Sequence, residues 1–175
     1  MELWDLYDKD KIKTGRTMLR GDKIPDGYYH LVVHACIFNS SGELLIQQRQ
    51  SFKEGWSNMW DITVGGSSVK GENSSEAVQR ELFEELGLNI CLNNIRPAIS
   101  INFDGGFDDV YLLERDVELE SLELQYDEVQ AVKWANLGEI LEMIDSREFI
   151  PYHKSFISLI FDMRGKYGAI NRENT

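Results

Sequence analysis

Runs of apolar residues separated by turn-forming residues predict several β-strands in the first third of the chain. Residues 28–39 are rich in β-branched and apolar side chains, and residues 43–50 (ELLIQQRQ) form a second run of this kind. The intervening Ser40-Ser41-Gly42 is typical of a tight turn, so the two runs predict a central β-hairpin. Shorter strands are predicted at residues 2–7, 17–20 and 60–64, the last ending at Gly65-Gly66.

The pattern changes to a helical period at residues 73–86. Asn73 is placed to cap the N-terminus of this helix together with Glu76 three residues later. Gly87 stands where a residue of left-handed conformation commonly ends a helix. The apolar stripe of the predicted helix consists of Val78, Leu82 and Leu86.

The second half of the chain predicts more strands and then helices. Strands are expected at residues 89–102, 110–117 and 128–134, with a loop at 103–109, and helices at 137–144 and after Pro151. Neither a repeat nor a linker interrupts the chain, which predicts one domain over residues 1–175. Residues 1–27 would be an N-terminal strand extension, and residues 151–175 a C-terminal helix and tail. This order predicts an α/β or α+β fold with a mixed sheet.

The charge balance limits the partners of the chain. It contains 18 Lys+Arg against 30 Asp+Glu, a net charge of −12, and its residues are 42% hydrophobic. This apolar content argues against a disordered chain. The negative charge opposes binding to bare nucleic acid or to an anionic membrane, so neither is expected as a partner. An anionic substrate would need metal ions beside it.

Targeting signals and cysteines indicate the compartment. The first residues lack the basic and apolar regions of a signal peptide, and no apolar run approaches the length of a membrane span. A cytoplasmic location is therefore expected. Cys36 and Cys91 both lie in apolar stretches, which in a reducing compartment predicts two buried free thiols.

Three glutamates on the predicted helix carry the candidate chemistry. Glu81, Glu84 and Glu85 are spaced i, i+3 and i+4, which predicts one acidic face directed away from the apolar stripe. Like charges at this spacing repel, and Arg80 neutralises only part of the cluster. A hard divalent cation such as Mg²⁺ would offset the remaining negative charge, since it takes oxygen ligands and its coordination is often completed by substrate phosphates. Taken alone, the glutamates are also compatible with an ordinary solvated face.

The residues around these glutamates form a longer motif. Gly66, Glu72 and the run RELFEELGL at residues 80–88 match without a gap the pattern Gly-x5-Glu-x7-Arg-Glu-U-x-Glu-Glu-x-Gly-U, where U is apolar. This stretch resembles the signature of the Nudix family. The resemblance implies the Nudix α/β/α sandwich with a mixed β-sheet and the characteristic loop and helix. It also implies hydrolysis of a nucleoside diphosphate linked to another moiety, with Mg²⁺ or Mn²⁺ as cofactor.

The resemblance further implies a role for each matching residue. Glu81, Glu84 and Glu85 correspond to the metal ligands of the family, with the carbonyl of Gly66 as a further candidate ligand. A metal ion held there would polarise the phosphoanhydride and lower the pKa of a bound water. The residues implied to orient the cluster are Arg80 and Glu72.

The base that deprotonates the attacking water is left open by the sequence. Glu84 is one candidate, as in parts of the family. A base outside the signature is the alternative, and the carboxylates that precede predicted strands are candidates for it. These are Asp108, Asp109 and Glu128.

A second resemblance concerns substrate binding. Residues 29–39, the run LLIQQR at 44–49 and Lys53 are similar to the corresponding stretch of isopentenyl-diphosphate isomerases, a Nudix branch that isomerises its substrate. This similarity implies that Arg49 and Lys53 contact the substrate diphosphate, ordinary surface charges being the alternative. The isomerases require a cysteine on the strand before the signature, where this chain reads Ile62-Thr63-Val64-Gly65-Gly66. Isomerase activity is therefore only the alternative function, beside a catalytically silent Nudix-fold binding module.

Other residues on the strands invite weaker hypotheses. His30, His34 and Cys36 share one face of a predicted strand, an arrangement compatible with zinc binding, but half-buried polar residues of an ordinary strand are the favoured interpretation. The aromatic residues that would either stack on a nucleobase or belong to the core are Trp56, Trp60 and Phe103.

Taken together, these patterns predict a cytoplasmic, Mg²⁺-dependent Nudix pyrophosphohydrolase acting on a small diphosphate, with a homodimer left open. Its specificity is expected in residues 11–27, residues 50–58 and the helix after Pro151, since loops and terminal segments outside the signature usually carry it.

Overall fold

Strand β3 (His30–Phe38) lies at the centre of the main sheet. The computed structural model of the protein describes residues 2–170. In it, β3 pairs in parallel with β8 (Gly106–Glu114) over nine residues and antiparallel with β6 (Val64–Ser67). Its side chains are buried on both faces, since Val33 and Ile37 belong to one core cluster and Phe38 belongs to the other. Continuous apolar sequence is typical of such a strand.

The main sheet is mixed, as expected. Its order is β5-β4-β3-β8-β7, with β6 beside β3 and β9 beside β4. The β3–β8 pair is parallel and its other pairs are antiparallel. The remaining strands are β4 (Leu44–Arg49), β5 (Trp60–Asp61), β7 (Ile99–Phe103) and β9 (Val129–Ala135).

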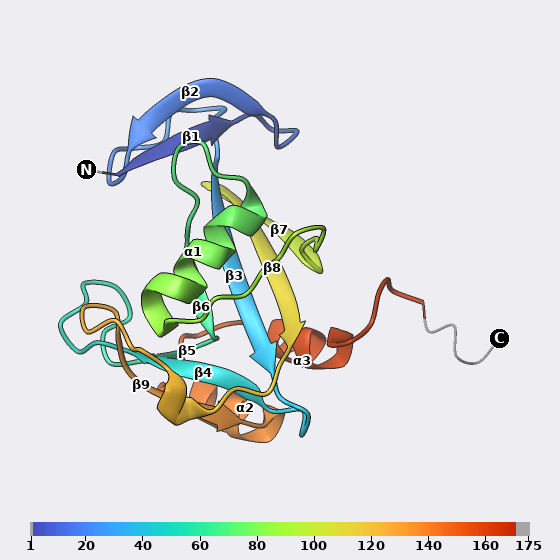
Figure 1. The fold of residues 1–175 in the computed structure, drawn as a ribbon. Helices are drawn as coiled ribbons and strands as arrows, with labels where there is room; N and C mark the ends of the chain where they lie inside the picture. Colours follow the sequence, from blue (N-terminus) through green and yellow to red (C-terminus); the bar gives the residue numbers. More distant parts are fainter. Residues whose placement is uncertain (1, 171–175) are drawn as a thin grey trace.

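Helices cover the two faces of this sheet (Figure 1). Helix α1 (Ser74–Leu86) packs its buried stripe on one face, while α2 (Leu137–Asp145) and α3 (Lys154–Met163) pack on the other. The predicted caps of α1 are confirmed. The Asn73 side chain accepts from the Glu76 amide, the Glu76 carboxylate accepts from the Asn73 amide, and Gly87 has φ +68°. A one-turn 3₁₀ helix spans Leu119–Ser121.

The strand predicted at 60–64 is wrong in one respect, because the segment divides into β5 and β6. Strands β3 and β4 pair only at Phe38 and Leu44, so the sheet opens between them. The Thr63 hydroxyl fills this opening, accepting from the Ile37 amide at 2.9 Å and donating to the Leu45 carbonyl at 2.6 Å. Residues on either side of Thr63 therefore pair with different strands.

The later strand boundaries also differ from the prediction. Only Ile99–Phe103 of the predicted strand 89–102 is regular, and residues 89–98 form an irregular segment with buried Leu92 held by Gln79. Strand β8 begins at Gly106, which shortens the predicted loop 103–109 to a tight turn. A Cβ at Gly106 would lie 2.1 Å from the His30 carbonyl oxygen, so a glycine permits this close strand pairing. Cys91 lies in the irregular segment and is exposed, against the prediction, whereas Cys36 is buried.

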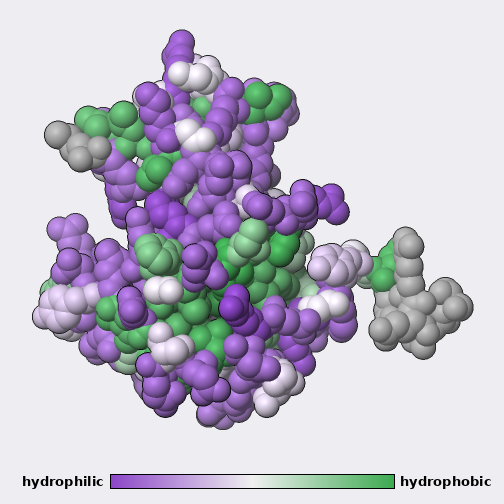
Figure 2. Space-filling model, viewed as in Figure 1, coloured by the Kyte–Doolittle hydropathy of each residue, from purple (hydrophilic) through white to green (hydrophobic). Residues whose placement is uncertain are grey.

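A second, two-stranded sheet forms the N-terminal hairpin, β1 (Leu3–Tyr7) and β2 (Lys13–Leu19). Strand β2 begins four residues before the predicted strand at 17–20. Its first residues are exposed and polar, so no apolar pattern indicates a strand there, and backbone pairing with β1 holds them in the sheet. The hairpin stands as a separate lobe above the sheet, with a hydrophilic waist below it (Figures 1 and 2). In residues 2–170, no helix combines the length and apolar character needed to cross a bilayer.

Candidate active site

Helix α1 presents its three glutamates in three different environments. The Glu84 side chain is 48% exposed, that of Glu81 is 12% exposed, and Glu85 is buried at 4%. The Glu85 carboxylate accepts a hydrogen bond of 2.8 Å from the Gln47 amide group on β4. The prediction of one acidic face turned away from the apolar stripe is therefore wrong for Glu85, because this side chain turns inward to strand β4.

Arg80 ties the helix to the loop that precedes it. Its Nε donates to Glu72 Oε1 at 2.7 Å, and its Nη2 donates to the Ser67 carbonyl at 3.0 Å. Its Nη1 reaches Glu81 at 2.8 Å and Glu84 at 3.0 Å. Although burial lowers the pKa of Arg80, the surrounding carboxylates raise it above its ordinary value, so the guanidinium stays charged. Arg80 thus joins the residues before α1 to two of the glutamates.

Burial makes the negative charge of this cluster costly. It raises the pKa of Glu81, although Arg80 opposes the shift. Burial, with added repulsion from Glu81, raises the pKa of Glu85 well above the usual glutamate range. One arginine therefore leaves the cluster with uncompensated negative charge, and a further cation would stabilise the ionised form.

The donor atoms at this place fit a hard divalent cation. They are carboxylate and carbonyl oxygens, which Mg²⁺ and Mn²⁺ prefer. The Gln47 Oε1 atom beside Glu85 is buried without a hydrogen-bond partner. At Gly66, a Cβ would lie 2.0 Å from Glu81 Oε1, so this carboxylate rests directly against the loop backbone. Within residues 2–170, no three acidic, His or Cys side chains already converge on one point, because Arg80 holds Glu81 and Glu84.

The glutamates line a cleft of about 390 Å³ that also contains basic side chains. Arg49 and Lys53, at and after the end of β4, form part of its wall. Lys53 makes a salt bridge of 2.6 Å with Glu128, which joins the loop after β4 to the segment before β9. The sequence-predicted residues that line this cleft are Arg49, Lys53, Gly66, Arg80, Glu81, Glu84, Glu85 and Glu128.

With this geometry established, comparison with known proteins identifies the family. The sequence model of the NUDIX domain matches residues 28–157. The chain belongs to the Nudix family. A Nudix hydrolase of Listeria innocua is 46% identical, over 94% of this chain and 96% of the relative. An isopentenyl-diphosphate Delta-isomerase of Escherichia coli is 28% identical, over 81% of this chain and 80% of the relative. A Deinococcus radiodurans protein of known crystal structure aligns with a TM-score of 0.70 and 27% identity, covering 91% of this chain and 97% of the other.

These matches confirm the family and the α/β fold class expected from the sequence. They also support the expected enzyme class, a Nudix pyrophosphohydrolase. The similarity to the isomerase branch is confirmed at the level of sequence, at lower identity than that to the Listeria relative. The Nudix signature occupies the stretch from Gly66 in β6 to Leu88 just after α1.

Two predicted candidates for the base lie outside the Nudix cleft. Asp108 and Asp109 do not precede a strand but lie within β8, where neighbouring residues point to opposite faces. Asp109 is buried and forms a salt bridge of 2.5 Å with Lys11. Asp108 accepts a hydrogen bond of 2.8 Å from His34 Nδ1. Glu128 is the candidate outside the signature that does line the cleft.

The residues considered for zinc binding have separate environments. His30 contacts the Gly105 carbonyl oxygen at 3.0 Å and stacks on Trp4 with ring centroids 4.4 Å apart. His34 pairs with Asp108, and Cys36 lies in the apolar core. Of the aromatic candidates, Trp56 and Phe103 are exposed and Trp60 packs against the core, and the described lining of the Nudix cleft includes none of the three.

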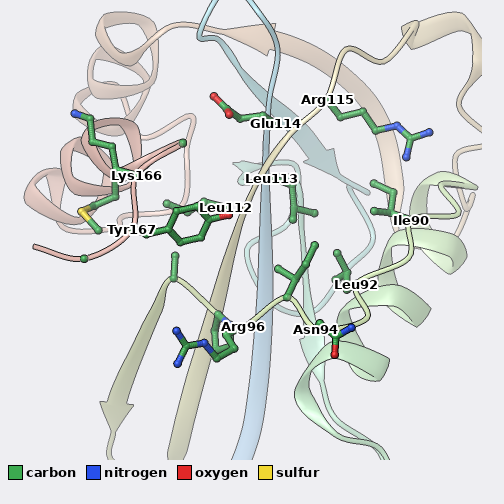
Figure 3. Close-up of a pocket in the computed structure, with 16 residues that line it drawn as sticks. Ile90, Leu92, Asn94, Arg96, Leu112, Leu113, Glu114, Arg115, Lys166 and Tyr167 are labelled. Atoms are coloured by element: carbon green, nitrogen blue, oxygen red, sulfur yellow. The ribbon is translucent and has the colours of Figure 1, made fainter. Parts of the chain in front are cut away.

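A larger cavity of about 640 Å³ lies between the irregular segment 89–98, the end of β8 and the chain after α3 (Figure 3). Among the described residues around it, Glu114 is the single carboxylate. In Figure 3, the side chains of Arg96 and Arg115 point away from each other, at two edges of an apolar centre. This cavity therefore lacks the carboxylate cluster of the smaller cleft, which remains the candidate active site.

Sequence reasoning missed residues in and beside the cleft. Gln47, which donates to Glu85 but is not among the lining residues, was recognisable in principle as a polar residue within the buried run of β4. Glu2, Arg20 and Gln125 line the cleft itself. Their signal was weaker, because they lie outside the Nudix signature and reach the site only through tertiary folding. The pairing of β1 with β2 places Glu2 and Arg20 side by side, with a salt bridge of 2.7 Å.

Proposed function

We propose that this Nudix chain is an Mg²⁺-dependent hydrolase, with Mn²⁺ as an alternative cofactor, that cleaves the phosphoanhydride bond of a nucleoside diphosphate derivative or a related small diphosphate. The observation that carries the proposal is one cleft in which Glu81, Glu84 and Glu85 stand together with Arg49 and Lys53. Carboxylates suit a divalent cation, and guanidinium and ammonium groups suit phosphate oxygens. Such a cleft has partners for both the metal and the substrate.

The metal would be held by Glu81, Glu84 and Glu85, with the carbonyl of Gly66 as a further donor. When bound, such an ion supplies Lewis-acid polarisation of the phosphoanhydride and a lowered pKa for a coordinated water. The glutamates need to exchange part of their contact with Arg80 for the ion. The position of Glu84 favours this exchange, because its side chain is half exposed and Arg80 holds it at 3.0 Å.

The remaining steps belong to the protein's own side chains. Arg49 and Lys53 bind the diphosphate and orient it toward the glutamates. Arg80, fixed by Glu72, keeps the helix and its loop in register. Glu84 is the proposed base, since its exposed carboxylate can take a proton from water, and Glu128 is the alternative, because it lines the same cleft.

The alternative isomerase function has less support from the structure. The two cysteines of the chain, Cys36 and Cys91, lie in the core and on the surface rather than on the segment 60–67. A Cβ at Gly65 would lie 2.3 Å from the His34 ring, and one at Gly66 would meet Glu81. A side chain at either glycine would therefore have to displace the His34 ring or the Glu81 carboxylate.

The proposal is tested by product release from a panel of nucleoside di- and triphosphates, dinucleoside polyphosphates, nucleotide sugars and isopentenyl diphosphate, each with Mg²⁺. We expect one class to be turned over by the wild type, with a loss of roughly 100-fold or more in Glu84→Gln and Glu85→Gln. Glu142→Gln, an exposed acid on α2, is the matched control and should keep full activity.

Three results would contradict the proposal. Full activity of Glu85→Gln would remove the glutamates from the mechanism. Conversion of isopentenyl diphosphate into an allylic product without phosphate release would favour the isomerase. Absence of both turnover and Mg²⁺ binding by calorimetry would indicate a silent binding module.

A further inference from the structure

The N-terminal hairpin contributes side chains to the candidate active site. Glu2 and Arg20, at the open end of the hairpin, line the same cleft as Arg49, Lys53 and the signature glutamates. The hairpin lies above α1 in Figure 1, and the loop after β4 lies below it on the same side. The cleft therefore has a third wall, which is built from a segment outside the residues 28–157 that match the NUDIX domain.

Specific contacts hold this wall against the signature loop. The Asp5 carboxylate accepts from the Gly71 amide at 2.9 Å and makes a salt bridge of 2.8 Å with Lys13. Lys13 also donates to the carbonyl oxygen of Glu72 at 2.6 Å. The backbone of the loop adds a bond of 2.7 Å from the Lys70 amide to the Leu3 carbonyl. The hairpin is thus fixed to the loop that carries Glu72.

A second anchor lies at the closed end of the hairpin. Lys11, in the turn between β1 and β2, reaches the buried carboxylate of Asp109 on β8 at 2.5 Å. The backbone of Tyr7 is also bridged to that of Tyr29, just before β3. Contacts at two separated places set the position of the hairpin, so its open end has a defined place at the cleft.

Arg20 is available to a ligand at this place. Its Nη1 atom donates to Glu2 Oε2 at 2.7 Å, but the Arg20 side chain is 61% exposed. With Glu2 itself 29% exposed, solvent weakens the attraction, and holding two long side chains in one geometry costs conformational entropy, so such a pair contributes little to stability. The two residues are also joined through their backbones, since the Arg20 amide donates a hydrogen bond to the Glu2 carbonyl at the open end of the hairpin. The salt bridge is therefore dispensable for the fold, and the guanidinium has free donors.

We propose that Arg20 is a substrate-binding residue, which exchanges the Glu2 carboxylate for a phosphate oxygen of the diphosphate. This inference rests on the proposed function. Arginine suits the role, because its planar fork of donors matches phosphate oxygens. With Arg20 on the hairpin and Arg49 and Lys53 across the cleft, the substrate's anionic group is held from two sides.

The test is the affinity of the full chain for methylenediphosphonate, a diphosphate that is not hydrolysed, measured by calorimetry with Mg²⁺. We expect Arg20→Gln to weaken binding about tenfold or more, since charge-assisted hydrogen bonds are lost. Arg20→Lys should recover part of the affinity. Arg16→Gln is the control, because Arg16 lies on the same hairpin over the Tyr28 ring and is not among the residues lining the cleft.

Glu2→Gln separates binding from a merely structural role. If Arg20 binds phosphate, this variant releases it from its competitor and should bind the probe as tightly as the wild type or more tightly. If the Glu2–Arg20 pair only supports the fold, Glu2→Gln should weaken binding as much as Arg20→Gln, and that result would overturn the proposal. Equal affinity of Arg20→Gln and Arg16→Gln, or failure of the wild type to bind the probe, would also overturn it.

The same variants keep this inference separate from the proposed function. If the wild type hydrolyses a diphosphate and Arg20→Gln does so with the same KM, the role of Arg20 is contradicted but the hydrolase function is not. A wild type that binds the probe through Arg20 but hydrolyses no diphosphate would contradict the hydrolase alone.

Discussion

At the residue scale, the absence of a side chain at position 66 shapes the candidate metal site. A Cβ there would lie 2.0 Å from Glu81 Oε1, so Gly66→Ala must displace the carboxylate or the loop. We expect this variant to lose roughly 10- to 100-fold in Mg²⁺-dependent hydrolysis, comparable to loss of a supporting contact at a metal site. Crowding should also destabilise the fold by about 1–3 kcal/mol in urea unfolding.

Gly55→Ala is the matched control for this prediction. Gly55 lies in the loop after β4, and a Cβ there meets nothing within 4 Å. It should therefore leave both hydrolysis and stability close to wild type. Wild-type hydrolysis by Gly66→Ala would show that Glu81 does not need its place against the loop.

The His34–Asp108 pair predicts a pH dependence of stability. Burial lowers the pKa of His34, but the hydrogen bond and charge of Asp108, together with the charges of Asp61 and Glu81, outweigh burial and raise the pKa above the ordinary histidine value. The pair's contribution to the free energy of unfolding is therefore fully present below the unfolded-state pKa and is lost as the pH rises through the folded-state value. Urea unfolding should show a larger stability difference between wild type and His34→Gln at about pH 5 than at about pH 9.

An exposed histidine provides the control for that measurement. His153 precedes α3 and makes no side-chain capping bond, so His153→Gln should show little change with pH. A stability difference for His34→Gln that is constant, or that grows toward high pH, would argue that the pair is not charged in the folded protein.

At the element scale, the hairpin depends on a buried carboxylate. Asp109 is 2% exposed, and its bonds go to Lys11 and to the Ser100 hydroxyl. We expect Lys11→Met to destabilise the protein by about 1–3 kcal/mol, because it leaves a buried charge without its partner. Asp109→Asn, which removes the charge itself, should cost less and keep Mg²⁺-dependent hydrolysis. Loss of hydrolysis in a folded Asp109→Asn protein would instead restore Asp109 as the catalytic base.

The elements also show which parts of the structure the sequence could predict. The signals of α1 are local, since its caps and its stripe of Val78, Leu82 and Leu86 lie within the helix itself, and they were predicted correctly. Strand β6 was missed because its glycines read as the end of a strand. In the fold they leave room for two groups that are distant in the sequence, the His34 ring and the Glu81 carboxylate. Residues 13–16 of strand β2 were missed because pairing with β1, rather than apolar side chains, defines this part of the strand.

The candidate site divides in the same way. The signature groups the glutamates and Arg80 on one helix, and in the structure all four line one cleft, because they lie within two turns of that helix. The inward turn of Glu85 toward Gln47 and the contribution of Arg20 depend on contacts between separate elements. No local pattern encodes these contacts, so they emerge only from the three-dimensional structure.

At the scale of the whole molecule, a net charge of −12 and a cluster of partly buried glutamates predict linkage between cation binding and stability. A cation bound only by the folded cluster raises the free energy of unfolding by about 2.7 kcal/mol at 100 times its Kd. The melting temperature should therefore rise with Mg²⁺ concentration in the millimolar range.

General screening of a highly acidic protein would also raise the melting temperature, so the comparison must separate the two effects. NaCl at the same ionic strength screens charge without offering a divalent ion, and should give a smaller shift. Glu85→Gln should keep the response to NaCl and lose most of the additional response to Mg²⁺, because the buried carboxylate beside Gln47 is removed. Equal shifts from the two salts in the wild type would contradict cation binding by the cluster in the substrate-free protein. The effect of Mg²⁺ would then be general screening of the surface charge.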